Sequence, residues 1–307
     1  MSKKVIVLGG SGMLGSMVAD SLSRNKGLNV AATVRTQELA GKCRERLPGV
    51  NWVIFDGGSP DVETRLDVIR GNDWVINAIG ITKPLIHDNN PAEVERAVLI
   101  NSLLPHQIAR QAQKHGVRVL QIATDCVFSG NKGSYIETDA HDALDAYGKT
   151  KSLGEVNYPQ INHLRCSIIG PEPKEHKFLL DWFVRQPKNA SVNGYTNHRW
   201  NGVTTLNFAR VCEGIIIRDI SLSHLQHIVP GGEVTKCDML GEFARSFHRE
   251  DVDIKPAQAA AVIDRTLKTS NEPLNKALWA AAGYSNPPTV PQMIAEMAAF
   301  DFKLGGL

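Results

Sequence analysis

The segment that most constrains this chain lies near its N-terminus, where an apolar run meets a glycine-rich loop. Residues 5–8 are continuously apolar, as expected of a parallel strand covered on both faces, and a helical pattern begins at residue 17. Strand, glycine loop and helix in this order form a dinucleotide-binding fingerprint, because glycines permit close backbone approach and the helix N-terminus offers free N–H groups to a pyrophosphate. This pattern predicts cofactor contacts at Gly9, Ser11, Gly12, Met13, Leu14 and Gly15.

Further strand-like runs follow at 29–34, 52–55, 74–76, 117–123 and 162–168, and helical patterns lie between them. One of these helices spans about 91–114 and carries Asn101 on an apolar stretch, where a buried amide needs hydrogen-bond partners. Five strand–helix alternations predict an α/β fold with a doubly wound parallel (Rossmann) sheet. We expect residues 1–170 to form the NAD(P)-binding domain. Residues 171–307, where prolines break the rhythm, should form a smaller substrate-binding region, with segments that could return to the sheet.

The residues after the second, third and fourth strands bear on the cofactor. A NAD-binding fold usually places an acidic residue about 20 residues after the loop, whereas here Arg35 lies near that point. A guanidinium suits a 2′-phosphate, so NADP(H) is preferred and NAD(H) is the alternative. Asp56 follows the third strand, where it could contact adenine or cap the next helix. After the fourth strand, small residues would let the backbone lie close to the cofactor, which predicts contacts at Asn77, Ala78 and Gly80.

The fifth strand and the helix after it supply the candidate catalytic residues. Thr124 falls at the carboxyl end of the strand, where open α/β sheets bind ligands. Tyr147 and Lys151 are four residues apart, which places them on one face of a helix. An ammonium group that stabilises the phenolate would lower the Tyr147 pKa and make the phenol a usable acid. We expect Tyr147 and Lys151 to contact the cofactor as well.

Composition excludes several classes of protein and site. The formal charge is +2, which argues against a nucleic-acid or anionic-membrane partner. Five scattered cysteines with no CxxC pair favour a reducing compartment and no structural zinc, and no other metal site is expected. The first apolar run is too short for a signal peptide or a membrane span, so a cytoplasmic protein without a membrane partner is expected.

These motifs together resemble the extended short-chain dehydrogenase/reductase superfamily. Within it, residues 123–130 (ATDCVFSG) and 147–155 (YGKTKSLGE) are similar to the dTDP-4-dehydrorhamnose reductase family. The resemblance implies that Thr124, Tyr147 and Lys151 are catalytic. It also implies that the enzyme reduces a 4-keto nucleotide-activated deoxysugar with NADPH, in deoxysugar or surface-polysaccharide biosynthesis.

Two departures from that family bear on the substrate. Cys126 stands where the rhamnose reductases have an aromatic residue and the related dehydratases have a glutamate, so elimination of water is disfavoured. Residues 203–205 read Val-Thr-Thr in place of a Pro-Thr element. We expect Arg199 to contact the diphosphate and Trp200 to stack on the substrate, against the alternatives of a loop ion pair and a half-buried anchor. An epimerase and a non-catalytic NADP-binding regulatory subunit are the other functions considered, and a homodimer is left open.

Overall fold

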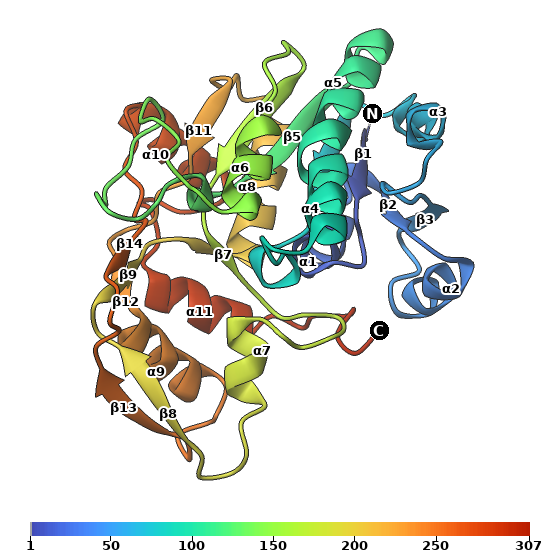
Figure 1. The fold of residues 1–307 in the computed structure, drawn as a ribbon. Coiled ribbons are helices and arrows are strands. Elements are labelled where there is room, and N and C mark those ends of the chain that lie inside the picture. The colour runs from blue at the N-terminus through green and yellow to red at the C-terminus, as the bar shows by residue number, and fades with distance from the viewer. Residues whose placement is uncertain (1) are drawn as a thin grey trace.

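The computed structural model describes residues 2–307, and its centre is a seven-stranded parallel sheet (Figure 1). Its strands are β1 (Lys3–Leu8), β2 (Leu28–Val34), β3 (Asn51–Ile54), β4 (Trp74–Asn77), β5 (Arg118–Ala123), β6 (Ile161–Arg165) and β11 (Leu225–His227). Their order across the sheet is β11-β6-β5-β4-β1-β2-β3, and each adjacent pair runs parallel. Strand order reverses at β1, so the predicted doubly wound α/β fold is confirmed.

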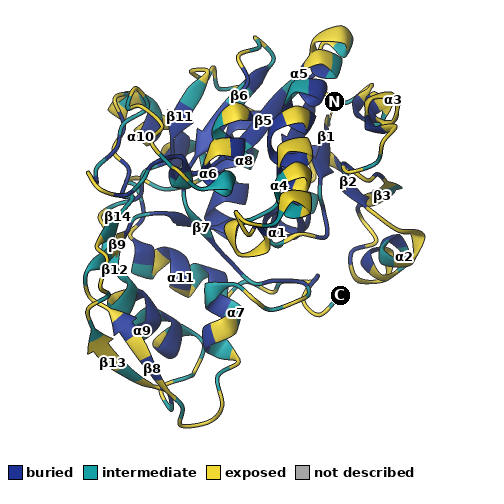
Figure 2. Cartoon of the chain, viewed as in Figure 1, coloured by how far each residue is buried: buried dark blue, intermediate teal, exposed yellow. Residues whose placement is uncertain are grey.

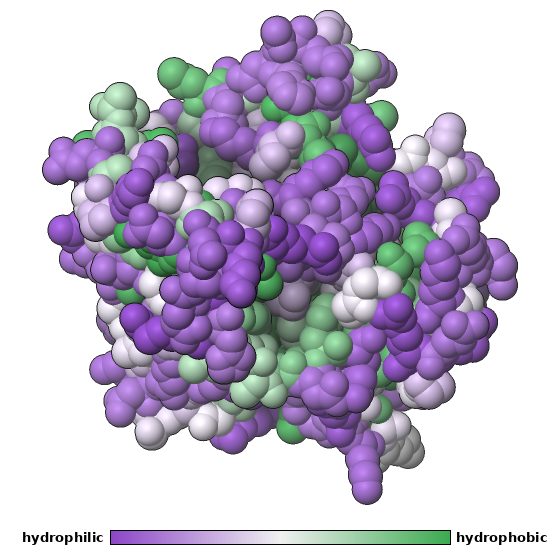
Figure 3. Space-filling model, turned by 90° about the horizontal axis from the view of Figure 1, so that it is seen from below, coloured by the Kyte–Doolittle hydropathy of each residue, from purple (hydrophilic) through white to green (hydrophobic). Residues whose placement is uncertain are grey.

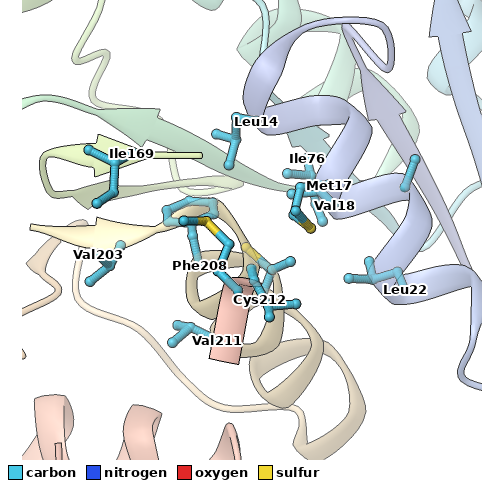
Figure 4. Close-up of a cluster of buried hydrophobic side chains, with 14 of the residues drawn as sticks. Leu14, Met17, Val18, Leu22, Ile76, Ile169, Val203, Phe208, Val211 and Cys212 are labelled. Atoms are coloured by element: carbon cyan, nitrogen blue, oxygen red, sulfur yellow. The ribbon is translucent and has the colours of Figure 1, made fainter. Parts of the chain in front are cut away.

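Helices cover both faces of this sheet and bury two separate apolar clusters (Figure 2). The helical segments of this half are α1 (Met13–Ser23), α2 (Gln37–Arg46), α3 (Val62–Arg65), η1 (Leu66–Ile69), η2 (Lys83–Leu85), α4 (Pro91–Ala97), η3 (Val98–Leu103), α5 (Leu104–His115), η4 (Asp125–Val127) and α6 (Ala146–Leu153). On one face, α1 contacts α8 (Thr205–Arg218), which comes from the second half of the chain. Leu14, Met17 and Val18 of α1 meet Phe208 and Cys212 of α8 in this cluster (Figure 4).

The second half also builds a smaller lobe, which lies below the sheet in Figure 1. The remaining elements of the second half are β7 (Ile168–Ile169), α7 (Leu179–Val184), β8 (Ser191–Tyr195), β9 (His198–Trp200), β10 (Val203–Thr204), β12 (Val234–Thr235), α9 (Lys236–Ser246), β13 (Asp253–Ala257), β14 (Ile263–Asp264), α10 (Glu272–Ala281) and α11 (Val290–Ala298). Strand β9 pairs with β12 and β14, and β8 pairs with β13. The lobe therefore consists of small sheets with helices around them.

The second half does return to the main sheet. Strand β11 pairs in parallel with β6 and becomes its seventh strand. The expected run 162–168 is divided, because β6 ends at Arg165 and β7 pairs with β10 outside the main sheet. The division into 1–170 and 171–307 stays a prediction, and chain segments do cross it.

The predicted long helix is present, with an irregular centre. Helices α4 and α5 are joined by η3, a π-helical segment that contains Asn101. The Asn101 amide donates to Ile81 O (2.9 Å) and its carbonyl oxygen accepts from Ile81 N (2.8 Å). Because this side chain replaces both backbone partners of Ile81, it fixes the loop that follows β4. In residues 2–307, no helix has both the length and the apolar character that crossing a bilayer requires.

Candidate active site

A cavity of about 850 Å³ follows the carboxyl edge of the sheet and extends to the smaller lobe. Figure 3 shows the molecule from below, with a partly apolar hollow near the centre of a largely hydrophilic surface. Segments after β1, β2, β3, β4 and β5 line one side, and residues from 166 onward line the other. Of the predicted site residues, Gly9, Ser11, Gly12, Met13, Leu14, Arg35, Asp56, Ala78, Gly80, Thr124, Tyr147, Lys151 and Trp200 line this cavity.

The glycine loop forms a close backbone cradle at one end. Gly9 has a φ of +85° and its N–H donates to Thr33 Oγ1 at 2.9 Å. A Cβ on Gly15 would lie 2.2 Å from Gly9 O, so only glycine permits this contact. Helix α1 begins at Gly12 with no side-chain cap, which leaves first-turn N–H groups free for an anion. Gly15 therefore shapes the loop and does not itself line the cavity.

Two cations lie beyond the loop. Arg35 is exposed directly after β2, and Lys174 from the second half also lines the cavity. Burial lowers the pKa of Lys174, and the nearby positive charge of Arg35 lowers it further. Both side chains line the cavity, and each senses the charge of the other. The sequence did not suggest Lys174, because only the fold brings it to Arg35.

Two predicted cofactor contacts have other partners. The Asn77 side chain is fully buried, donates to Gln121 Oε1 (2.7 Å) and accepts from Ile79 N (3.1 Å). It does not line the cavity and it positions the loop through these hydrogen bonds, so its cofactor contact stays a prediction that the geometry does not favour. Asp56 lines the cavity but accepts from Gly58 N at 3.0 Å, and the residue at the N-cap of the next helix is Asp61.

The three candidate catalytic residues meet in the middle of the cavity. Thr124 is the residue directly after β5, and its Oγ1 accepts from Cys126 N at 3.2 Å. Helix α6 is capped by Asp145, which accepts from Gly148 N at 2.9 Å and thereby fixes the start of the turn that carries Tyr147. Lys151 follows one turn later and donates from Nζ to Ile122 O at 3.1 Å.

The pKa values in this cluster differ from the expectation. Burial raises the pKa of Tyr147, the nearby Cys126 and Asp125 raise it further, and only a hydrogen bond with Thr124 lowers it. Burial also lowers the pKa of Lys151 to about 8, partly opposed by Glu155. The expected net lowering of the Tyr147 pKa by Lys151 is therefore wrong for this structure, because desolvation dominates. The phenol is fully protonated at neutral pH.

The substrate side was predicted only in part. In β9, neighbouring residues face opposite ways: Arg199 is exposed and ion-paired with Glu233, whereas Trp200 is 5% exposed and lines the cavity. Arg199 therefore lies outside the cavity and has the ion pair that was its alternative, so its contact with substrate stays a prediction that the geometry does not favour. The cation that does enter this end of the cavity is Lys236, the first residue of α9, which sequence reasoning missed.

Cys126 also lines the cavity, and burial raises the pKa of its thiol to about 12. A thiol that stays protonated is a poor nucleophile, so we interpret Cys126 as a packing residue. Across residues 2–307, no group of three His, Cys, Asp or Glu side chains could hold a metal ion.

A second buried cluster, which the sequence did not reveal, lies beside the site. Arg165 is fully buried at the end of β6, where it pairs with Glu155 and donates to His227 Nε2 (2.9 Å) and His141 Nε2 (2.7 Å). Burial and the Arg165 charge lower the pKa of His227 to about 4, so its ring is neutral at pH 7. This cluster ties the C-terminal end of α6 to β6 and β11.

Comparison with known proteins agrees with this arrangement. The family model described as "RmlD substrate binding domain" matches residues 3–300. The dTDP-4-dehydrorhamnose reductase of Salmonella typhimurium is 30% identical over 172 residues, which cover 53% of this chain and 56% of that protein. Its Escherichia coli counterpart is 39% identical over 139 residues, covering 42% and 46%. The chain thus spans about half the length of the curated relatives it matches.

Solved structures match over nearly the whole length. A dTDP-4-dehydrorhamnose reductase from Clostridium acetobutylicum has a TM-score of 0.73 at 20% identity, covering 96% of this chain and 98% of that one. One from Bacillus anthracis, in complex with NADP, has a TM-score of 0.74 at 16% identity, covering 97% and 99%. These likenesses establish the fold. With the family match over residues 3–300, they confirm the predicted resemblance: the chain belongs to the RmlD substrate binding domain family of extended short-chain dehydrogenase/reductase proteins.

Proposed function

We propose that this protein is an NADPH-dependent reductase of a 4-keto nucleotide-activated deoxysugar. The observation that carries the proposal is that one cavity joins a dinucleotide-type glycine loop to Thr124, Tyr147 and Lys151. The family membership and the names of the curated relatives support the same reaction and a dTDP-linked sugar. Deoxysugar or surface-polysaccharide biosynthesis is the corresponding setting.

The cavity suits a dinucleotide phosphate at its loop end. The start of α1, whose N-cap Gly12 supplies no side-chain cap, and the close Gly9–Gly15 backbone contact would receive a pyrophosphate. Arg35 and Lys174 would hold a 2′-phosphate, because a guanidinium and an ammonium line this end of the cavity and an anion there can accept from both. NADP(H) is therefore the proposed cofactor and NAD(H) the alternative. When bound, NADPH supplies the hydride.

The chain itself supplies orientation and a proton. The protonated Tyr147 phenol would donate its proton to the substrate oxygen as negative charge develops there. The Thr124 hydroxyl, now shared with Asp125 at 3.2 Å, would turn to hydrogen-bond the same oxygen. Lys151 would stabilise the resulting phenolate from the next turn of α6. Acid catalysis of this kind typically contributes about 10²–10⁴-fold in rate.

The location and the assembly state belong to the proposal as well. A cytoplasmic enzyme with a nucleotide-sugar substrate fits the cysteine usage and the near-neutral charge, which does not favour a nucleic-acid partner. A homodimer stays a prediction.

The test is NADPH consumption by the purified protein with a panel of dTDP-, UDP-, GDP- and CDP-linked 4-keto sugars. We expect stoichiometric loss of NADPH absorbance with at least one of them, and weaker activity with NADH. Conversion of a nucleotide sugar without net NADPH loss would favour an epimerase. Tight NADPH binding, no turnover and a stable complex with another enzyme would favour a regulatory subunit.

A further inference from the structure

Lys236 stands at the substrate end of the cavity, on a helix start that its neighbours fix. Thr235 caps α9 by accepting from Asp238 N (3.1 Å), and Asp238 in turn accepts from Thr235 N (3.0 Å). This capping box places Lys236 in the first helical position. From there its ammonium lies 5.5 Å from the centre of the Trp200 ring, and both side chains line the cavity.

This cation forms no close ion pair with the residues that the structure describes, although the Asp125 carboxylate is near enough to act on it. Among residues 2–307, no carboxylate lies within 4.0 Å of the Lys236 ammonium, whereas Lys83 at the cavity rim pairs with Asp145 and Arg199 pairs with Glu233. The position is also unfavourable for a cation, because helix N-termini carry partial positive charge. Burial lowers the pKa of Lys236 to about 8, partly opposed by Asp125 and Cys126. A cation kept at such a cost without a partner suggests a ligand.

The residues around Lys236 indicate where such a ligand would bind. The Asp125 carboxylate acts on Lys236 and directly follows Thr124, and all three residues line the same cavity, so the ammonium lies on the Thr124 side of it. The Trp200 indole N–H donates to Ser167 Oγ at 2.8 Å, which holds the ring in place beneath the ammonium. The cations at the other end, Arg35 and Lys174, are on the side of the glycine loop.

We propose that Lys236 binds the diphosphate of the nucleotide-sugar substrate and so determines affinity for it. The inference rests on the proposed function. A nucleotide sugar brings two phosphate charges into a half-enclosed cavity, and an anion there gains most from a cation that is already desolvated and unpaired. Lys236 thus takes the role that sequence reasoning gave to Arg199, which faces the opposite side of β9.

The experiment measures the Kd of dTDP and UDP by calorimetry for the full-length wild type, Lys236→Met and Arg199→Met. Methionine keeps the stem of the side chain and removes the charge, and Arg199→Met removes a cation of the same lobe that lies outside the cavity. Loss of a hydrogen bond to a charged group should weaken binding of the better nucleotide roughly 10- to 100-fold in Lys236→Met. Arg199→Met should stay within about twofold of wild type. NADPH affinity, read from its fluorescence, should be unchanged in both variants.

The outcomes separate this inference from the proposed function. If the wild type binds NADPH but no nucleoside diphosphate, the nucleotide-sugar function fails and the role of Lys236 fails with it. If the wild type binds dTDP or UDP and Lys236→Met binds it equally well, only the role of Lys236 fails. UDP-glucose and UDP-glucuronate are titrated in the same way. If Lys236→Met weakened binding of UDP-glucuronate alone, the ammonium would belong to a sugar carboxylate and the diphosphate assignment would be overturned.

With a turned-over substrate, a binding role predicts a raised KM at nearly constant kcat. A lowered kcat with unchanged KM and an altered pH profile would instead make Lys236 a proton-transfer group and contradict the proposal.

Discussion

Helix α6 and Glu155, which follows its end, border two regions, and each region contains a buried positively charged side chain. On the cavity side, Lys151 has only the Ile122 carbonyl as a hydrogen-bond partner among the described residues. On the other side, Arg165 distributes its guanidinium over Glu155, His141 and His227. Both cations are almost fully removed from water, yet one is left nearly free and the other is fully paired.

The difference separates catalysis from stability. A buried charged side chain whose hydrogen-bond and ion-pair partners are all present holds the surrounding elements together. Removing one member of such a pair leaves an uncompensated charge in the interior. A buried charge with incomplete partners costs free energy in the empty protein and is available to a ligand. Lys151 belongs to the second kind, as does the half-buried Lys236, and Arg165 belongs to the first. Four substitutions test this division, from the largest expected effect to the smallest.

Tyr147→Phe tests the cavity side most directly. It removes the proposed proton donor and keeps the ring, so kcat should fall about 10²- to 10⁴-fold with NADPH affinity unchanged. Steady-state kinetics on the active keto sugar measures the effect, and Tyr195→Phe, on exposed β8, is the matched control. Wild-type kcat in Tyr147→Phe would rule out the assigned acid.

Arg165→Met tests the paired side. It leaves the Glu155 carboxylate without its cation and His227 Nε2 without a donor, so the free energy of unfolding should fall by about 3–5 kcal/mol. Urea denaturation measures the loss. Arg199→Met, which removes an exposed ion pair, should cost about 0–1 kcal/mol. Equal losses in the two variants would remove the distinction between the two regions.

Lys151→Met should reverse the pattern of Arg165→Met. Activity should fall, yet the free energy of unfolding at pH 7 should change by less than about 1 kcal/mol or rise, because a desolvated and poorly paired charge is removed. The folded-state pKa of about 8 lies below the ordinary 10.5, so wild-type stability should rise between these pH values and the variant should lose that rise. A stability loss like that of Arg165→Met would show Lys151 to be structural.

Glu137→Gln gives the smallest and most specific effect. Although burial opposes it, hydrogen bonds from Ser270 N and Thr269 Oγ1 lower the pKa of Glu137 from 4.5 to about 2. The unfolded chain therefore binds more protons in this interval, so the contribution of Glu137 is complete above about pH 4.5 and is lost as the pH falls towards 2. Thermal melts across this range should show a shallower acid slope in the variant. An unchanged slope would exclude Glu137 as a source of acid sensitivity.

Much of the fold followed from the sequence because its signals are local. The apolar runs, the glycine loop and the four-residue spacing of Tyr147 and Lys151 each lie within one element, and the structure places them as expected. The sequence indicated that Asn101 needs hydrogen-bond partners, and the backbone N–H and C=O of Ile81 provide them.

The parts that were missed depend on tertiary contacts. Lys174 reaches Arg35, and Arg165 reaches His227, only after distant segments fold together. The different orientations of Arg199 and Trp200 have a local cause: neighbouring residues in a strand face opposite sides, and only Trp200 of β9 lines the cavity. The pKa of Tyr147 was misjudged because burial, which no spacing reveals, outweighs a nearby charge.

The return of β11 to the edge of β6 has a consequence for the order of folding. As the chain is synthesised from its N-terminus, β6 emerges with one edge unpaired, and Arg165 lacks the His227 acceptor until β11 follows. We expect the pairing of β11 with β6 to form late, because contacts between distant segments need costly loop closure. A fragment ending near residue 170 would keep a bare strand edge open to other chains. The boundary that looks natural in the sequence is thus a poor place to divide the protein.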